Sequence, residues 1–92
     1  MNLQQAESLA IEALSWMAAD EDLLMRFFAT TGIGADDLRG RAGEPEFLGF
    51  VLDFLLSDDD ATIAFAEASN RRPEDAMRAR AALPGGDVPN WT

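Results

Sequence analysis

Apolar and polar positions alternate at helical spacing along most of this chain. In residues 3–18 one stripe is polar, with successive members three or four positions apart: Gln4, Ser8, Glu12 and Ser15. The opposite side carries Leu3, Ala6, Leu9, Ala10, Ala13, Leu14 and Met17. This pattern predicts a helix over residues 3–18 whose apolar side, with the neighbouring Trp16, faces the core.

A second helix is predicted over residues 20–30, because Asp20 is a typical N-cap residue and two further acids follow it in the first turn. Its buried face would consist of Leu24, Phe27 and Phe28. Gly32 is the expected left-handed C-cap, and the apolar Ile33 that follows it is expected to pack against the end of the helix. A short helix over residues 35–39 would follow, and residues 40–43 read as a loop between two halves.

Residues 45–56 predict the central helix of a bundle. Pro45 suits the first helical position, and apolar side chains lie nearly all round the segment: Phe47, Leu48, Phe50, Val51, Leu52, Phe54, Leu55 and Leu56. Gly49 costs about 1 kcal/mol in helix propensity relative to Ala, which a closely crossing neighbour would explain. Alternatively, one flank of this helix stays exposed and pairs with a second copy of the chain.

The last two helices are predicted over residues 59–69 and 73–83. Asp58 would cap the first of them, and Asn70 would take a left-handed conformation after it. The inward positions of residues 59–69 would be Ala61, Ala64, Phe65 and Ala68. Pro84, followed by two glycines, would end the final helix. No segment shows the alternating β-branched pattern of a strand.

The chain also repeats its plan after 38 residues. The matched pairs are 20–22 with 58–60, Phe27 with Phe65, Gly32 with Asn70, and 36–37 with 74–75. Structural pseudo-symmetry and the chance likeness of amphipathic helices both explain this echo. We expect an all-α fold, a compact bundle of five to six helices in which two three-helix halves would surround the central apolar helix. Residues 1–86 would form a single domain and residues 87–92 an irregular tail.

Composition excludes several kinds of chemistry. The 92 residues contain no Cys and no His, and Lys and Tyr are also absent, so disulfides, thiol or lysine nucleophiles and the commonest metal ligand are ruled out. The net charge of −10 opposes binding to nucleic acid and to anionic membranes. The N-terminus lacks a basic signal-peptide region, and no apolar run reaches the roughly 20 residues that span a bilayer. We therefore expect a cytoplasmic protein.

Acidic residues gather at the predicted helix starts, which accommodate twelve of the seventeen carboxylates. The triplet at 58–60 invites a divalent-metal interpretation, but the calcium-loop pattern would need glycine and glutamate where Ile63 and Ser69 stand. Capping of backbone N–H groups is the simpler interpretation. Paired carboxylates for acid–base hydrolysis are a further alternative.

Candidate partner-binding residues are the basic cluster near the C-terminus, Arg71, Arg72, Arg78 and Arg80, together with Trp91. The arginines suit either solvated helix ends or an acidic protein partner, and Trp91 either folds back on the bundle or engages a partner. Each half has the order of a helix–turn–helix, but carboxylates open both would-be recognition helices and would repel phosphates.

Several motifs together resemble a small alphaproteobacterial family that is known only as a domain of unknown function. They are Thr31-Gly32-Ile33, Asp36-Asp37-Leu38-Arg39, Pro45-Glu46-Phe47-Leu48, Val51-Leu52-Asp53-Phe54-Leu55 and Ala81-Ala82-Leu83-Pro84-Gly85. The resemblance extends from about Ala6 to Gly85. It implies a bacterial, cytoplasmic, all-helical protein and supplies no activity and no functional residues.

These observations favour a non-enzymatic protein-interaction or regulatory module without a cofactor or metal. The alternative is a small carboxylate- or metal-dependent enzyme, such as a hydrolase. The expected partner is another protein, not nucleic acid or a membrane, and the chain itself would be a monomer or weak homodimer.

Overall fold

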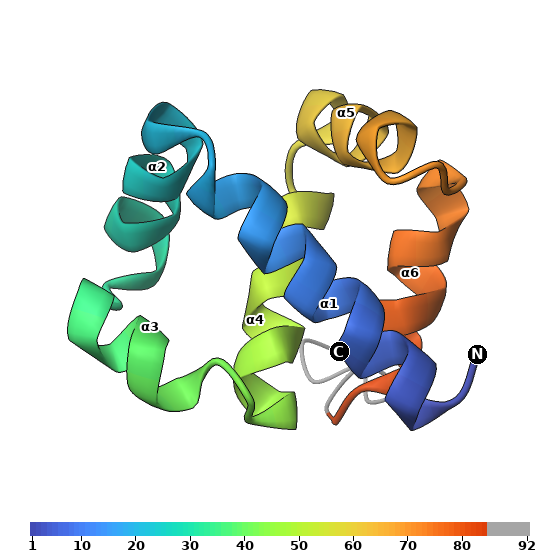
Figure 1. The fold of residues 1–92 in the computed structure, drawn as a ribbon, viewed down its shortest axis with the longest axis horizontal. Coiled ribbons are helices and arrows are strands. Elements are labelled where there is room, and N and C mark those ends of the chain that lie inside the picture. Colours follow the sequence, from blue (N-terminus) through green and yellow to red (C-terminus); the bar gives the residue numbers. More distant parts are fainter. Residues whose placement is uncertain (85–92) are drawn as a thin grey trace, which may run out of the picture.

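The computed structural model describes residues 1–84, which form six α-helices joined by short turns (Figure 1). They are α1 (Leu3–Ala18), α2 (Glu21–Thr31), α3 (Ala35–Arg41), α4 (Pro45–Leu56), α5 (Asp59–Ala68) and α6 (Pro73–Ala82). The all-α bundle of five to six helices expected from the sequence is therefore confirmed. The predicted tail at 87–92 and Trp91 lie outside the described residues.

The two longest helices, α1 and α4, cross at the centre of the bundle. Figure 1 shows α2 and α3 on one side of this crossing and α5 and α6 on the other. The buried side of α1 consists of Ala6, Leu9, Ala10, Ala13, Leu14 and Met17. This is the face predicted from the sequence, except that Leu3 is 47% exposed because it lies in the first turn, beyond the crossing. Trp16 is half-buried against the core.

Helix α4 occupies the central position that its apolar sequence predicts. Its buried residues are Phe47, Leu48, Gly49, Val51, Leu52, Phe54 and Leu55. Phe27 of α2 packs against Phe54 and Phe47 of this helix with nearly perpendicular rings, whose centroids are 5.3 and 6.2 Å from its own. Such edge-to-face pairs add to the free energy of burial. Phe50 is the exception, since it is 49% exposed.

Gly49 is tolerated in α4 because a neighbour passes close to it. A methyl group in place of its hydrogen would lie 3.1 Å from Nη1 of Arg80 and 3.3 Å from its Cζ. The close approach that the sequence suggested is thus made by a guanidinium group from α6, rather than by the backbone of a crossing helix.

Some of the predicted positions are wrong. Helix α3 continues to Arg41, so Gly40 and Arg41 are helical instead of forming a loop. The side chain of Arg41 contacts Glu44 at 3.3 Å and lies over the ring of Phe47 at 5.6 Å, so the end of α3 is joined to the start of α4. In α2 the buried leucine is Leu23, whereas Leu24, which was predicted to face inward, is only partly buried.

The inward face of α5 is also rotated from the predicted one. Ala64 and Ala68 are exposed, whereas Thr62 and Ala66 are buried. Thr62 can be buried because its hydroxyl has two backbone partners: it donates to the carbonyl of Leu55 at 2.7 Å and lies 3.0 Å from that of Asp58. A hydroxyl that is satisfied in this way carries little cost of burial.

The 38-residue echo is present in the local structure. Helices α2 and α5 begin at matched positions, as do α3 and α6. The matched residues Gly32 and Asn70 both adopt left-handed conformations, with φ of 73° and 58°. The packing differs, however, because α6 buries Ala76 and Ala79 whereas α3 buries no residue fully. Within residues 1–84, no helix is both long and apolar enough to cross a membrane.

Replacing Phe27 should test the aromatic contact that joins α2 to α4. Phe27 is fully buried, so Phe27→Ala should lower the free energy of unfolding by about 3–5 kcal/mol. The half-exposed Phe50 is the matched control, and Phe50→Ala should cost less than about 1 kcal/mol. Urea unfolding followed by Trp fluorescence measures both, and equal losses would show that the core is not centred on Phe27.

Candidate functional site

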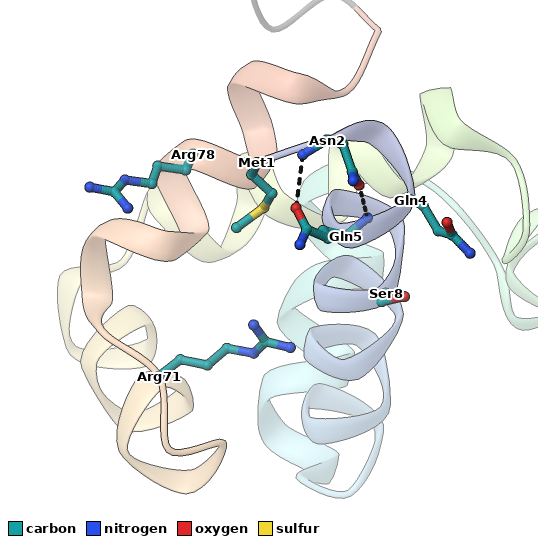
Figure 2. A pocket seen from close by; sticks show the side chains of 7 residues that line it. All are labelled: Met1, Asn2, Gln4, Gln5, Ser8, Arg71 and Arg78. Atoms are coloured by element: carbon teal, nitrogen blue, oxygen red, sulfur yellow. Dashed lines mark hydrogen bonds between the residues drawn. The ribbon is translucent and has the colours of Figure 1, made fainter.

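Arg71, the first of the candidate partner-binding arginines, is tied to α1. Its Nε and Nη2 donate to the carboxylate of Glu12 at 3.4 and 3.0 Å, so the turn between α5 and α6 is linked to α1 by two parallel hydrogen bonds. This pair raises the pKa of Arg71, because the carboxylate of Glu12 accepts hydrogen bonds from the charged guanidinium. Figure 2 shows the Arg71 side chain extending across the gap towards α1.

Arg80 is likewise used within the fold. Its Nε and Nη2 donate to Asp53 of α4 at 2.6 and 3.1 Å, and its Nη1 donates to the carbonyl of Pro84 at 3.1 Å. The side chain is only 19% exposed, and its guanidinium lies over Gly49. Arg80 therefore joins α6 to α4 and to the segment that follows α6.

The other two candidates are exposed. Arg72 lies 3.6 Å from Glu74, and Arg78 lies 4.0 Å from Asp75. Both side chains are more than half exposed, so these pairs contribute little to stability. The four arginines of the sequence prediction thus divide into two that hold helices together and two that lie exposed in surface ion pairs.

Arg78 lines a polar cleft of about 710 Å³ beside the N-terminus of α1 (Figure 2). The remaining lining residues are Met1, Asn2, Gln4, Gln5, Ser8 and Arg71. Asn2 and Gln5 bond to each other through a reciprocal helix cap, at 2.8 and 3.0 Å. In Figure 2 Arg78 and Gln4 extend in opposite directions, so the polar groups do not converge on a common point.

Asp20 and Asp58, the first residues of the two acidic triplets, cap α2 and α5, whereas α3 and α4 begin without a side-chain cap. Asp20 accepts a hydrogen bond from the N–H of Leu23 at 3.2 Å, and Asp58 accepts one from Ala61 at 3.1 Å, as the sequence predicts. Asp58 also accepts a hydrogen bond from Arg26 of α2 at 2.8 Å. The Arg26 hydrogen bond, with help from the Ala61 N–H, lowers the pKa of Asp58. In the part of the chain that the structure describes, no three acidic residues are grouped so that they could hold a metal ion.

A second cleft, of about 580 Å³, lies between α5 and α6 and was not anticipated from the sequence. We call it the α5–α6 groove; its lining residues are Leu56, Asp59, Thr62, Ile63, Pro73, Glu74 and Met77. Ile63 and Met77 are 45% and 63% exposed. In the sequence, each of these two residues is an apolar side chain among polar neighbours on its helix face. Single exposed apolar residues are common, however, so this pattern did not predict a groove.

Comparison with known proteins identifies a family without assigning an activity. The model of a family described as "Protein of unknown function (DUF3572)" matches residues 3–86. This match confirms the resemblance to a domain of unknown function that the sequence motifs indicated. No curated protein and no solved structure matches the chain significantly.

The ion pair at Asp58 should make stability depend on acid pH. Because folding lowers the pKa of Asp58 below its ordinary value of 3.8, the stabilisation is complete above that value and is lost as the pH falls through the lowered one. Asp58→Ser keeps a capping oxygen but has no charge, so its free energy of unfolding should fall less between about pH 5 and pH 2 than that of the wild type. Arg26→Met should likewise make the free energy of unfolding depend less on pH over this range. Urea titrations at each pH measure the three proteins, and the same pH dependence in all three would contradict this account.

Arg80 and Arg72 offer a comparison of a structural with a solvated arginine. Arg80→Met removes the hydrogen bonds to Asp53 and Pro84 and should cost about 1–3 kcal/mol in unfolding free energy. Arg72→Met makes the same chemical change at an exposed pair and should stay within about 0.5 kcal/mol of the wild type. Thermal and urea unfolding of the two variants would show whether Arg80 holds α6 in place. Similar losses of unfolding free energy in both variants would contradict this role.

Proposed function

Because the chain belongs to the DUF3572 family of proteins of unknown function, we propose a function from its own surface: it is a non-enzymatic protein-interaction module. The α5–α6 groove is its docking site for another protein. The proposal keeps the bacterial cytoplasmic location and the monomeric or weakly dimeric state that the sequence favours.

The observation that carries this proposal is the apolar exposure in the α5–α6 groove. Ile63 of α5 and Met77 of α6 are exposed on the same concave surface, beside Leu56 at the end of α4. Thr62 contributes no unsatisfied hydroxyl to the floor, because that group donates to the carbonyl of Leu55. An apolar concave surface with a satisfied floor gains free energy when another apolar surface covers it.

The positions of the charged side chains support binding rather than catalysis. Asp20 and Asp58 are engaged by backbone N–H groups, and Arg71 and Arg80 by carboxylates of other helices. A general acid or base needs a pKa near the working pH, which normally requires burial or a like charge close by. Asp58 has the opposite shift, since its pKa is lowered.

Photocrosslinking should locate the docking surface. A photoreactive amino acid at Met77 should crosslink one defined protein in extracts of the cells that make this chain, because Met77 lies in the α5–α6 groove. Met25 of α2 is the matched control, since it is similarly exposed, at 60% against 63%, but lies on another helix. The Met77 product should disappear when Ile63→Asp is introduced into the same chain.

Two results would contradict the proposed function. One is a set of crosslinked products that is the same from Met25 and Met77, which would indicate contact without specificity. The other is that every product crosslinked from Met77 still forms when Ile63→Asp is present, or that Met77 gives no product. This comparison uses extracts in which the chain is present at its natural concentration.

A further inference from the structure

We propose that the α5–α6 groove receives the apolar side of a positively charged amphipathic helix from another protein. This inference rests on the proposed function and adds to it the chemistry of the partner. It is supported by the shape of the groove, by the charge at its rim and by a comparison of the two halves of the chain.

The shape of the groove suits a helix. Its apolar contacts come from three helices, with Leu56 at the end of α4, Ile63 on α5 and Met77 on α6. The lining residues of α5 and α6 fall in the first part of each helix, at 59–63 and 73–77, so each helix contributes about 7 Å of its length to the groove. A partner helix that lies over the groove can place apolar side chains from positions i, i+3 and i+4 on its floor.

The charge at the rim selects a cationic partner. Asp59 and Glu74 line the groove, and no basic residue does so. No cation among residues 1–84 lies within ion-pair distance of Asp59, and the only one near Glu74 is Arg72, at 3.6 Å and exposed. The chain as a whole, with these carboxylates included, has a net charge of −10. Lysine or arginine residues beside the apolar side of a partner helix would meet these carboxylates and would be drawn towards the chain.

The same charges argue against other occupants. In a symmetric dimer the same surface of each copy meets the other, so a dimer through the α5–α6 groove would bring Asp59 and Glu74 close to their own counterparts. Nucleic acid and anionic membranes carry the negative sign that this rim repels.

The 38-residue echo gives each residue of the α5–α6 groove a counterpart in the first half of the chain. The acids at the rim have counterparts, since Asp59 matches Glu21 and Glu74 matches Asp36. Ile63 also matches an apolar residue, Met25. The other four lining positions differ, however. Met77 is matched by Arg39, Leu56 by Ala18, Thr62 by Leu24 and Pro73 by Ala35. The α2–α3 side therefore offers carboxylates at matched helix starts but a cationic side chain in place of Met77, which makes it an internal control.

The test uses a fluorescent model peptide and the full chain. The peptide has about 18 residues, long enough to form a helix, with Leu on one side and Lys on the other. Fluorescence anisotropy should show binding that weakens as salt is added. The groove variant Asp59→Asn/Glu74→Gln should bind roughly tenfold more weakly. The control variant Glu21→Gln/Asp36→Asn removes the same charge at the matched positions and should stay within about twofold of the wild type.

The apolar floor is tested by a second pair. Met77→Asp should abolish peptide binding, whereas Met25→Asp adds the same charge on α2 and should leave it within about twofold. Melting temperatures separate binding from folding. Asp59, Glu74, Glu21 and Asp36 all lie in first helical turns, so both double variants should melt slightly and similarly below the wild type.

Three outcomes would overturn the inference. They are equal losses in the groove and control variants, equal binding of a peptide in which Glu replaces Lys, and failure of the Leu–Lys peptide to bind at all. Specific crosslinking from Met77 together with any of these would keep the proposed function and reject only the cationic helix. Peptide binding that depends on the α5–α6 groove, without a crosslinked cellular protein, would reject the proposed function instead.

Discussion

The contact of α1 with α4 is the constraint on which the rest of this structure depends. Small residues on α1, such as Ala6, Ala10 and Ala13, are fully buried, and side chains of this size let neighbouring helices pack closely against α1. Phe27 then anchors α2 against α4, while α6 reaches α4 through the guanidinium group of Arg80 above Gly49. Each outer helix is positioned by what it can bury against this central pair.

Arginine acts in this chain as a connector between helices. Arg26 joins α2 to the start of α5, Arg71 joins the α5–α6 turn to α1, and Arg80 joins α6 to α4. A guanidinium can bond to two carboxylate oxygens at once, which holds both direction and distance. The consequence for function is that half of the basic cluster is occupied, and the exposed surface is left with an excess of carboxylates.

The two halves share their local plan but differ in the surfaces that they expose. Helix starts and left-handed caps recur after 38 residues, including Gly32 and Asn70. Their third helices diverge, because α6 packs its alanines into the core whereas α3 buries none of its residues fully. The α5–α6 groove is formed where α6 packs beside α5, and Met77 contributes an apolar surface there that Arg39 does not.

By itself, the sequence determined the helices, their Asp20 and Asp58 caps and the left-handed residues, because these depend on interactions within about four residues along the chain. It also indicated the buried side of α1, whose polar stripe is continuous. Only the tertiary structure decided which face of α5 turns inward, that Arg80 pairs with Asp53, and that Ile63 and Met77 share a groove. These contacts join residues far apart in sequence, and they depend on how the helices cross, for which no local pattern carries a signal.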